Sequence, residues 1–322
     1  MKSYLRVFAA ICAAWLASTP AHAQTDPWPS KPIRIVTPTP AGVGSDAFSR
    51  LYADKLSKAL KVPVVVENRP GALSTLGVDA VAKAPADGYT ILISTGNPFT
   101  VAPHLLARLP YNPEKDFIPV TQIFRGGSFL VVNKDVPVKS LRELVAMAKA
   151  TPGKVTFASY GSGTTSHLGL ELLQDAAGVE MLHVPYKQGA MVDVIGGQVM
   201  VGWEPPVSAL PHIKAGRVRA LAYTGSARSS ALPDVPTLAE SFPGLEVFTW
   251  VGVWLPANTP PAIVQRLHAT LTTITQTPEM LRYIEEAGNE PISPTPAETA
   301  AFIKRESQFM GTLIKAKNIK LD

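Results

Sequence analysis

The stretch IRIVTPTPAGVGSDAFSR, residues 33–50, places the strongest constraint on the fold. Its first residues alternate as a strand, a turn rich in Pro and Gly follows, and Ser45-Asp46 begins a helix with one apolar face. This order aims unpaired backbone N–H groups and the positive end of a helix dipole at one point, which favours an anion. The same pattern also fits an ordinary strand-to-helix connection that binds nothing. It is not a nucleotide motif, because GxxxxGK[ST] lacks its Lys and GxGxxG lacks its third Gly.

The first 23 residues are predicted to be a signal peptide. Lys2 and Arg6 precede a short apolar run over residues 7–17, and an A-x-A cleavage site ends at Ala23. The run is too short to span a bilayer. The single Cys of the chain, Cys12, lies inside this segment, so we expect the mature chain to use no disulfide or thiol chemistry. The prediction is an exported protein of the bacterial periplasm.

Charge and histidine spacing argue against two classes of function. The chain carries 30 Lys and Arg against 25 Asp and Glu, a net charge of +5, and Lys2 and Arg6 belong to the predicted signal peptide. The mature chain is therefore mildly basic and has no Lys/Arg cluster, so we expect no nucleic-acid partner. We also expect no metal and no cofactor, because no ligand-like spacing relates the histidines beyond the signal peptide, which are His104, His167, His183, His212 and His268.

One catalytic arrangement can be drawn from the sequence, a hydrolase triad of Ser162, His167 and Asp175. Ser162 lies in YGSGT rather than in G-x-S-x-G. A helix from about Ser166 would also separate His167 from Asp175 by more than two turns. We therefore expect no enzymatic activity.

Strands alternate with helices in the first part of the chain. We expect strands over residues 33–36, 62–67 and 89–94, and further helices over residues 75–83 and 101–109. This order predicts a parallel α/β sheet, and such sheets bind ligands at the carboxyl ends of their strands. The polar loop Thr95-Gly96-Asn97 lies at that edge, as does the turn before Ser45.

The pattern then repeats in a predicted second lobe. An extended segment over residues 117–133 passes Gly126-Gly127 as one crossing, and residues 245–255 cross back. Between them we expect a helix with a capping box at Ser140 and Glu143, and strands over residues 155–159, 181–184, 199–203 and 218–223. The predicted fold class is α/β, a two-lobed clamshell with two parallel-type sheets flanked by helices. We place one lobe at residues 24–125 plus 246–322 and the other at 126–245.

The C-terminal part is predicted to be helical. Three helices are expected to begin at Thr-Pro pairs, in which Thr is the N-cap and Pro the first helical residue, at Thr259, Thr277 and Thr295. The last helix is expected to bury one apolar stripe, formed by Phe302, Ile303, Phe309, Met310, Leu313 and Ile314.

Several segments of the chain carry a family resemblance. They include PWPSKPIRIVTPTPAGVGSD, VVVENRPGA, LPYNPEKDFIPV, GSGTTSHL, HVPYKQGA and ALPDVPTLAE. The chain resembles the Bug-type extracytoplasmic receptors of tripartite tricarboxylate transporters, over essentially all of its mature length. The resemblance implies a type II periplasmic-binding-protein fold and a monomer that binds a small carboxylate: a di- or tricarboxylate, an acidic amino acid or an aromatic acid. It also implies delivery to integral membrane permease subunits. A ligand-sensing receptor that docks onto a membrane signalling protein remains the alternative, since one clamshell serves both roles.

The resemblance also implies which residues bind the ligand. In the first lobe they lie in two loops, and in the second lobe they follow three strands. The implied set is Thr39, Ala41, Gly42, Val43, Ser45, Asp46, Thr95, Asn97, Ser162, Thr164, Thr165, Tyr186 and Glu204. Neutral N–H and hydroxyl donors at helix starts would hold the carboxylate without a buried Arg.

Two departures from the family pattern change the expected pocket. PTPAGVG stands where the family usually has PFPAGGG, so Thr39 replaces an aromatic wall and Val43 replaces a Gly. In the later segment Met200 and Glu204 stand where the family usually has Asp. Glu204 is either a solvated surface carboxylate or an acceptor in the pocket. Its neighbour Trp203 belongs either to the core or to the pocket wall.

Overall fold

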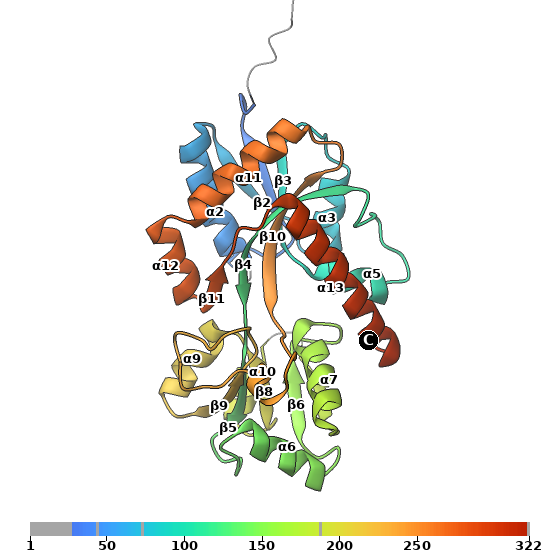
Figure 1. The fold of residues 1–322 in the computed structure, drawn as a ribbon, viewed down its shortest axis with the longest axis vertical. Helices are drawn as coiled ribbons and strands as arrows, with labels where there is room; N and C mark the ends of the chain where they lie inside the picture. The colour runs from blue at the N-terminus through green and yellow to red at the C-terminus, as the bar shows by residue number, and fades with distance from the viewer. Residues whose placement is uncertain (1–27, 43–44, 72–73, 187–188, 321–322) are drawn as a thin grey trace, which may run out of the picture.

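The computed structural model describes residues 28–42, 45–71, 74–186 and 189–320. The chain forms two lobes, one above the other, each built on its own sheet (Figure 1). The larger sheet has six strands in the order β11-β4-β10-β3-β1-β2, and the smaller has five in the order β7-β6-β8-β5-β9. We call the elements on the six-stranded sheet the first lobe and those on the five-stranded sheet the second lobe. The predicted signal peptide lies outside the described residues.

The first lobe is a sheet with helices on both faces. Its parallel strands are β1 (Ile33–Thr37), β2 (Val64–Asn68) and β3 (Thr90–Thr95). One face packs on α2 (Asp46–Leu60), α11 (Pro261–Thr275) and α12 (Pro278–Glu286), and the other on α3 (Thr75–Ala82) and α13 (Pro296–Ala316). The alternation of Ile35 and Val36 explains this, because successive strand residues point to opposite faces.

The second lobe repeats this layered design. Strands β6 (Thr156–Ser159), β7 (Leu182–Pro185) and β8 (Val201–Glu204) are parallel, and β5 (Phe129–Asn133) joins β8 to β9 (Val218–Tyr223). Helices α6 (Leu141–Ala150), α7 (Thr165–Ala177) and α10 (Leu238–Ser241) cover one face, and α8 (Met191–Ile195) and α9 (Pro206–Lys214) the other.

Two extended segments connect the lobes. Strand β4 (Phe117–Gly126) of the first sheet leads into β5 of the second, and the chain returns into β10 (Thr249–Pro256). Strands β4 and β10 pair antiparallel to each other, and β11 (Asn289–Pro291) pairs antiparallel to β4. The predicted crossings are therefore present. Both sheets are mixed rather than parallel throughout, because strands that run between the lobes enter each sheet in the opposite direction.

Two of the three predicted Thr-Pro helix starts are confirmed. Thr277 caps α12 through the Met280 N–H, and Thr295 forms a full capping box with Glu298 on α13. The prediction at Thr259 was wrong. Its hydroxyl donates to the Pro256 carbonyl at 2.7 Å, and α11 begins two residues later with Pro260 as its N-cap.

Three further predictions need correction. The helix expected over residues 101–109 is confined to α5 (Ala102–Leu105), and a separate short helix, α4 (Asn97–Thr100), precedes it. Each has a Pro in its first turn, where the missing N–H is tolerated. Ser140 caps the Glu143 N–H, but the Glu143 carboxylate accepts from Lys139 N–H, so the capping box is incomplete. Phe309 of α13 is 51% exposed, so it is not part of the buried apolar stripe.

The end of α13 joins the two lobes. A small apolar cluster contains Val101, Leu313 and Ile314 from the first lobe and the fully buried Leu168 from α7 of the second. Lys317, which directly follows α13, forms ion pairs with Glu171 and Asp175 on the same face of α7. Within the described residues, no helix combines the length and the apolar character that crossing a membrane requires.

We expect Leu168→Ala to lower the free energy of unfolding by about 2–5 kcal/mol, because it leaves a cavity in this cluster. Leu76→Ala is the matched control, since Leu76 is 55% exposed on α3 and its truncation should change stability by about 0.5 kcal/mol or less. Urea denaturation of the two variants measures both effects. Equal losses would show that the contact between α13 and α7 contributes little.

Candidate functional site

A cavity of about 530 Å³ lies between the lobes, and we call it the cleft cavity. Its lining comes from the loops after β1 and β3 in the first lobe and after β6 and β8 in the second. Both crossings also border it. Six of the predicted binding residues line this cavity, namely Gly42, Ser45, Thr95, Asn97, Thr164 and Thr165.

The carboxylate of Asp46 holds the first loop in shape. It accepts hydrogen bonds from Gly42 N–H at 2.8 Å, Arg50 Nε at 2.9 Å and Asn68 Nδ2 at 2.7 Å. Burial alone would raise the pKa of Asp46, but the hydrogen bonds from Arg50, Gly42 and Asn68 outweigh it and lower that pKa. Asp46 is 1% exposed and does not line the cleft cavity, so it positions the loop and leaves the cavity to its neighbours.

Three hydroxyl groups support the start of α2. The Oγ atoms of Thr37, Thr39 and Ser45 lie 3.2–3.3 Å from one another. Ser45 lines the cleft cavity, whereas Thr39 does not. The Thr39 carbonyl accepts a hydrogen bond from Asn68 Nδ2 at 2.9 Å. Thr39 therefore gives Ser45 a hydrogen-bonded support.

In the second lobe, the start of α7 lines the cleft cavity. Thr164 is the N-cap, and its hydroxyl donates to the Gly161 carbonyl at 2.7 Å. Leu168 N–H makes the first helical hydrogen bond, to Thr164 O at 2.9 Å. The N–H groups of Thr165 and Ser166 precede that bond, and both residues line the cleft cavity. The helix start is therefore available to an acceptor in the cavity.

Three side chains in the cleft cavity are free to bind a ligand. Thr95 ends β3, Asn97 begins α4 and Thr165 begins α7. None of the three side chains makes a hydrogen bond to another described residue, although all three are partly buried. Two of them come from the first lobe and one from the second, so a ligand between them would contact both lobes.

A pair of histidines lies beneath the loop that precedes α7. The rings of His167 and His183 stack with centroids 4.0 Å apart and an angle of 6° between their planes. His167 Nδ1 accepts from Gly163 N–H at 3.0 Å, and His183 Nε2 lies 2.6 Å from Ser159 Oγ. His167 therefore supports the loop, and the rejected triad is not assembled, because Asp175 is paired with Lys317 instead.

Glu204 is buried behind the cavity wall. Its side chain is 1% exposed, and its Oε2 accepts from the hydroxyls of Tyr160 at 2.8 Å and Ser208 at 2.9 Å. Burial raises the pKa of Glu204, although the hydrogen bonds from Tyr160 and Ser208 oppose that shift. The reading of Glu204 as a solvated surface residue was wrong. The carboxylate does not line the cleft cavity either, but Tyr160, which it holds, does.

The other predicted residues lie in different places. Ser162 lines a smaller neighbouring cavity of about 110 Å³, together with Thr95, Asn97 and Thr164. Ala41 is exposed outside both cavities, and the Tyr186 hydroxyl donates to Asp193 at 2.8 Å, away from both. Val43 falls outside the described residues.

Most of the aromatic wall was not predicted from the sequence. Phe48, Phe124 and Tyr283 of the first lobe line the cleft cavity, as do Tyr160 and Trp203 of the second. Phe48 contacts Phe124 with centroids 4.3 Å apart and Tyr283 with centroids 5.3 Å apart. Only Trp203 was considered for the wall, and it is also packed in the core of the second lobe. The position of Phe48 one turn after the predicted loop was the one available signal.

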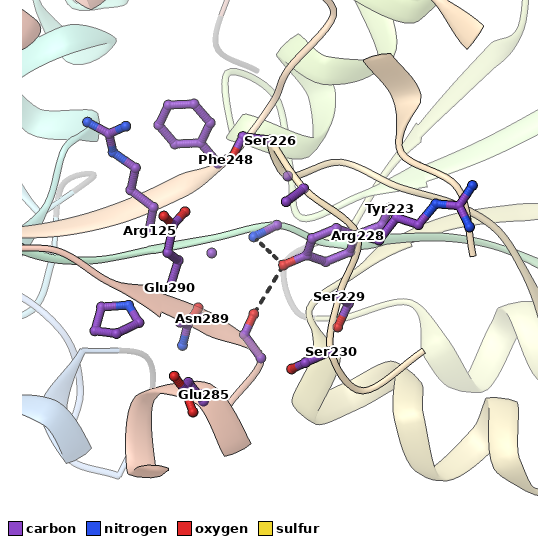
Figure 2. A pocket seen from close by; sticks show the side chains of 16 residues that line it. Arg125, Tyr223, Ser226, Arg228, Ser229, Ser230, Phe248, Glu285, Asn289 and Glu290 are labelled. Carbon is purple, nitrogen blue, oxygen red and sulfur yellow. Dashed lines mark hydrogen bonds between the residues drawn. The ribbon is translucent and has the colours of Figure 1, made fainter. Parts of the chain in front are cut away.

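A third cavity, of about 430 Å³, lies beside the crossings and is shown in Figure 2. We call it the hinge cavity. Tyr223 of β9 reaches into it, and its hydroxyl accepts from Gly127 N–H at 3.0 Å and donates to the Gly288 carbonyl at 3.1 Å. Arg125 at its edge packs over the rings of Phe248 and Phe302. The hydrogen bonds of Tyr223 and the ring contacts of Arg125 therefore link separate segments of the chain around the hinge cavity.

Comparisons with known proteins agree with the geometry. A family model described as tripartite tricarboxylate transporter family receptor matches residues 48–319. BugT of Bordetella pertussis is 36% identical over 309 residues, which are 95% of each chain. An R. palustris protein solved with adipate is 31% identical, with a TM-score of 0.80 over 92% of this chain and 100% of that one. MatC of Rhodopseudomonas palustris, solved with bound malate, is 28% identical, with a TM-score of 0.75 over 89% of this chain and 100% of its own.

The buried carboxyl of Glu204 should make stability depend on pH. Its pKa is raised in the folded state, so stability should fall as pH rises from the ordinary carboxyl range through the raised pKa. Glu204→Gln removes this titration, so we expect the variant to gain stability relative to the wild type between pH 4 and pH 7. Urea denaturation at both pH values measures the difference.

Glu240→Gln is the control of opposite sign. Hydrogen bonds from Arg228 lower the pKa of Glu240 to about 2, so that carboxylate stabilises the fold above its ordinary pKa and loses this effect as pH falls. This variant should therefore lose stability relative to the wild type as pH rises from 4 to 7. The same trend in both variants would contradict the account of Glu204.

Proposed function

Because the chain belongs to the receptor family of tripartite tricarboxylate transporters, we propose that it is a periplasmic receptor for a small carboxylate, which it delivers to the membrane permease subunits of such a transporter. One observation carries the proposal. Two helices, α2 from the first lobe and α7 from the second, begin at the same cavity and present unpaired donors to it. Helix starts of this kind stabilise an anion through N–H groups and the helix dipole.

A binding role fits the lining better than catalysis does. Among the described residues that line the cleft cavity, there is no His, Cys, Asp, Glu, Lys or Arg. A nucleophile activated by a base, or an acid–base pair, needs at least one such group within hydrogen-bond reach of the substrate. We therefore propose a receptor rather than an enzyme, acting as a monomer after export and removal of residues 1–23.

The lobe boundaries proposed from the sequence suit this role. Strand β4 ends at Gly126 and β5 begins at Phe129, close to the proposed boundary after residue 125. Residue 246 precedes β10 by only a few residues. We propose that the lobes move about these two connections when the ligand enters or leaves.

A thermal-shift screen of the mature protein against small carboxylates tests the proposal. Ligand binding stabilises the native state by RT ln(1 + [L]/Kd), about 2.7 kcal/mol at a hundredfold excess over Kd. The expected result is a higher melting temperature with at least one carboxylate, and recovery of that compound chemically unchanged. A flat panel, or conversion of the compound, would overturn the proposal.

Thr165→Val should weaken carboxylate binding by about 10- to 150-fold. The change keeps the side-chain volume and removes a free donor, and a hydrogen bond to a charged group contributes about 1.5–3 kcal/mol. Thr273→Val, on the exposed surface of α11, is the matched control and should bind as the wild type does. Titration calorimetry gives both affinities. Equal affinities of the two variants would place the carboxylate elsewhere.

Gly288→Ala should hold the cleft open. Gly288 faces Pro206 of the other lobe, and an added Cβ would lie 2.4 Å from the Pro206 ring. Because such a contact is too short, the lobes would have to separate. We expect weaker binding and a larger radius of gyration at ligand saturation, measured by small-angle X-ray scattering.

Gly244→Ala separates this effect from backbone strain. Gly244 has φ +84°, close to the +77° of Gly288, but a Cβ there meets nothing within 4 Å. This control should cost about 1–3 kcal/mol of stability and leave the affinity and the saturated radius unchanged. If both variants behave alike, contact between Gly288 and Pro206 does not limit closure.

A further inference from the structure

The cleft cavity is polar at one end and aromatic at the other. Thr95, Asn97 and Thr164 line both the cleft cavity and the small cavity beside it, so these polar residues mark one end. Gly126 and Asn289 line both the cleft cavity and the hinge cavity, so they mark the other. The aromatic cluster of Phe48, Phe124 and Tyr283 belongs to this second end, because Phe124 lies two residues before Gly126 and pairs with Pro291 of β11.

The charge of the lining suits a single carboxylate. Its described residues include no cationic side chain. Two arginines line the adjoining hinge cavity, but Arg125 lies over the rings of Phe248 and Phe302, and Arg228 is paired with Glu240. Burying an unpaired carboxylate is costly, whereas one carboxylate at the polar end meets the start of α7 and the side chains of Thr95 and Asn97. Of the two ends, only the polar one is therefore suited to an anion.

The aromatic end suits a flat apolar body, and its walls are rigid. Phe48 is 8% exposed and Phe124 is 6% exposed, so both rings are fixed by packing. Across the cavity, Trp203 is packed into the core of the second lobe, and Tyr160 is held through its hydroxyl by Glu204. Fixed aromatic faces favour another ring by offset or edge-to-face contacts. At about 530 Å³, the cavity has the size of an ordinary small-molecule site.

We infer that the ligand is an aromatic monocarboxylate, with its carboxylate at the start of α7 beside Thr95 and Asn97 and its ring against Phe48, Phe124 and Tyr283. This inference rests on the proposed function and narrows it. It separates this chain from the structural relatives solved with adipate and malate, which are aliphatic dicarboxylates.

Calorimetry with matched acids tests the two parts of the inference. Benzoate against cyclohexanecarboxylate isolates the aromatic ring, and benzoate against terephthalate isolates the second charge. We expect benzoate to bind about 2- to 12-fold more tightly than cyclohexanecarboxylate, the range for an aromatic pair. We expect terephthalate and adipate to bind at least tenfold more weakly than benzoate. A dicarboxylate that binds more tightly than benzoate, or equal binding of benzoate and cyclohexanecarboxylate, would overturn the inference and leave the receptor role intact.

Variants test whether the ligand ring lies against the aromatic cluster. Tyr283→Leu should lower benzoate affinity by about 2- to 12-fold and leave cyclohexanecarboxylate nearly unchanged. Tyr283 is 39% exposed, so its replacement does not threaten folding as Phe48→Leu could. Phe309→Leu, at an exposed position of α13, is the control and should change neither affinity. Unchanged benzoate binding by Tyr283→Leu would contradict this placement. Absence of binding by every carboxylate tested would instead remove the proposed function itself.

Discussion

The contact between Gly127 and Tyr223 fixes the arrangement on which the cleft depends. A Cβ at position 127 would lie 2.4 Å from the Tyr223 ring, so only glycine lets the crossing pass so close. The Tyr223 hydroxyl then joins Gly127 N–H to the Gly288 carbonyl. One side chain of the second lobe thus ties a crossing to the turn before β11. Both tied segments line the cleft cavity, so this contact fixes where the two segments lie relative to each other in the cavity wall.

Two other contacts between the lobes bury apolar groups. The cluster around Leu168 is apolar and buried, so separating α13 from α7 would expose apolar surface at about 25 cal/mol per Å². Gly288 packs against the buried Pro206 at the start of α9, and the Gly288 carbonyl accepts a hydrogen bond from the Tyr223 hydroxyl. Parting the lobes where α9 begins would therefore expose the Pro206 ring and break this hydrogen bond.

Local patterns predicted the fold, and the site only in part. Strand alternation and glycine turns located both sheets and both crossings, because these signals depend on neighbouring residues. The helix expected over residues 101–109 was too long, since only α5, from Ala102 to Leu105, forms within it. The loop donors were predictable, because strand ends lie at the ligand edge of a sheet. The cluster of Phe48, Phe124 and Tyr283 was not predictable, because tertiary packing brings it together from α2, β4 and α12.

Glu204 and Asp46 show why polar residues at that edge need not face a ligand. Glu204 is the last residue of β8, one residue beyond the predicted strand end, and its carboxylate accepts from Tyr160 and Ser208. Asp46 begins α2, and its carboxylate is used by Gly42, Arg50 and Asn68. Each acid is therefore engaged by donors of its own chain and positions a residue that does line the cavity. The first loop and the Tyr160 ring are thus held in place by two carboxylates that do not themselves line the cleft cavity.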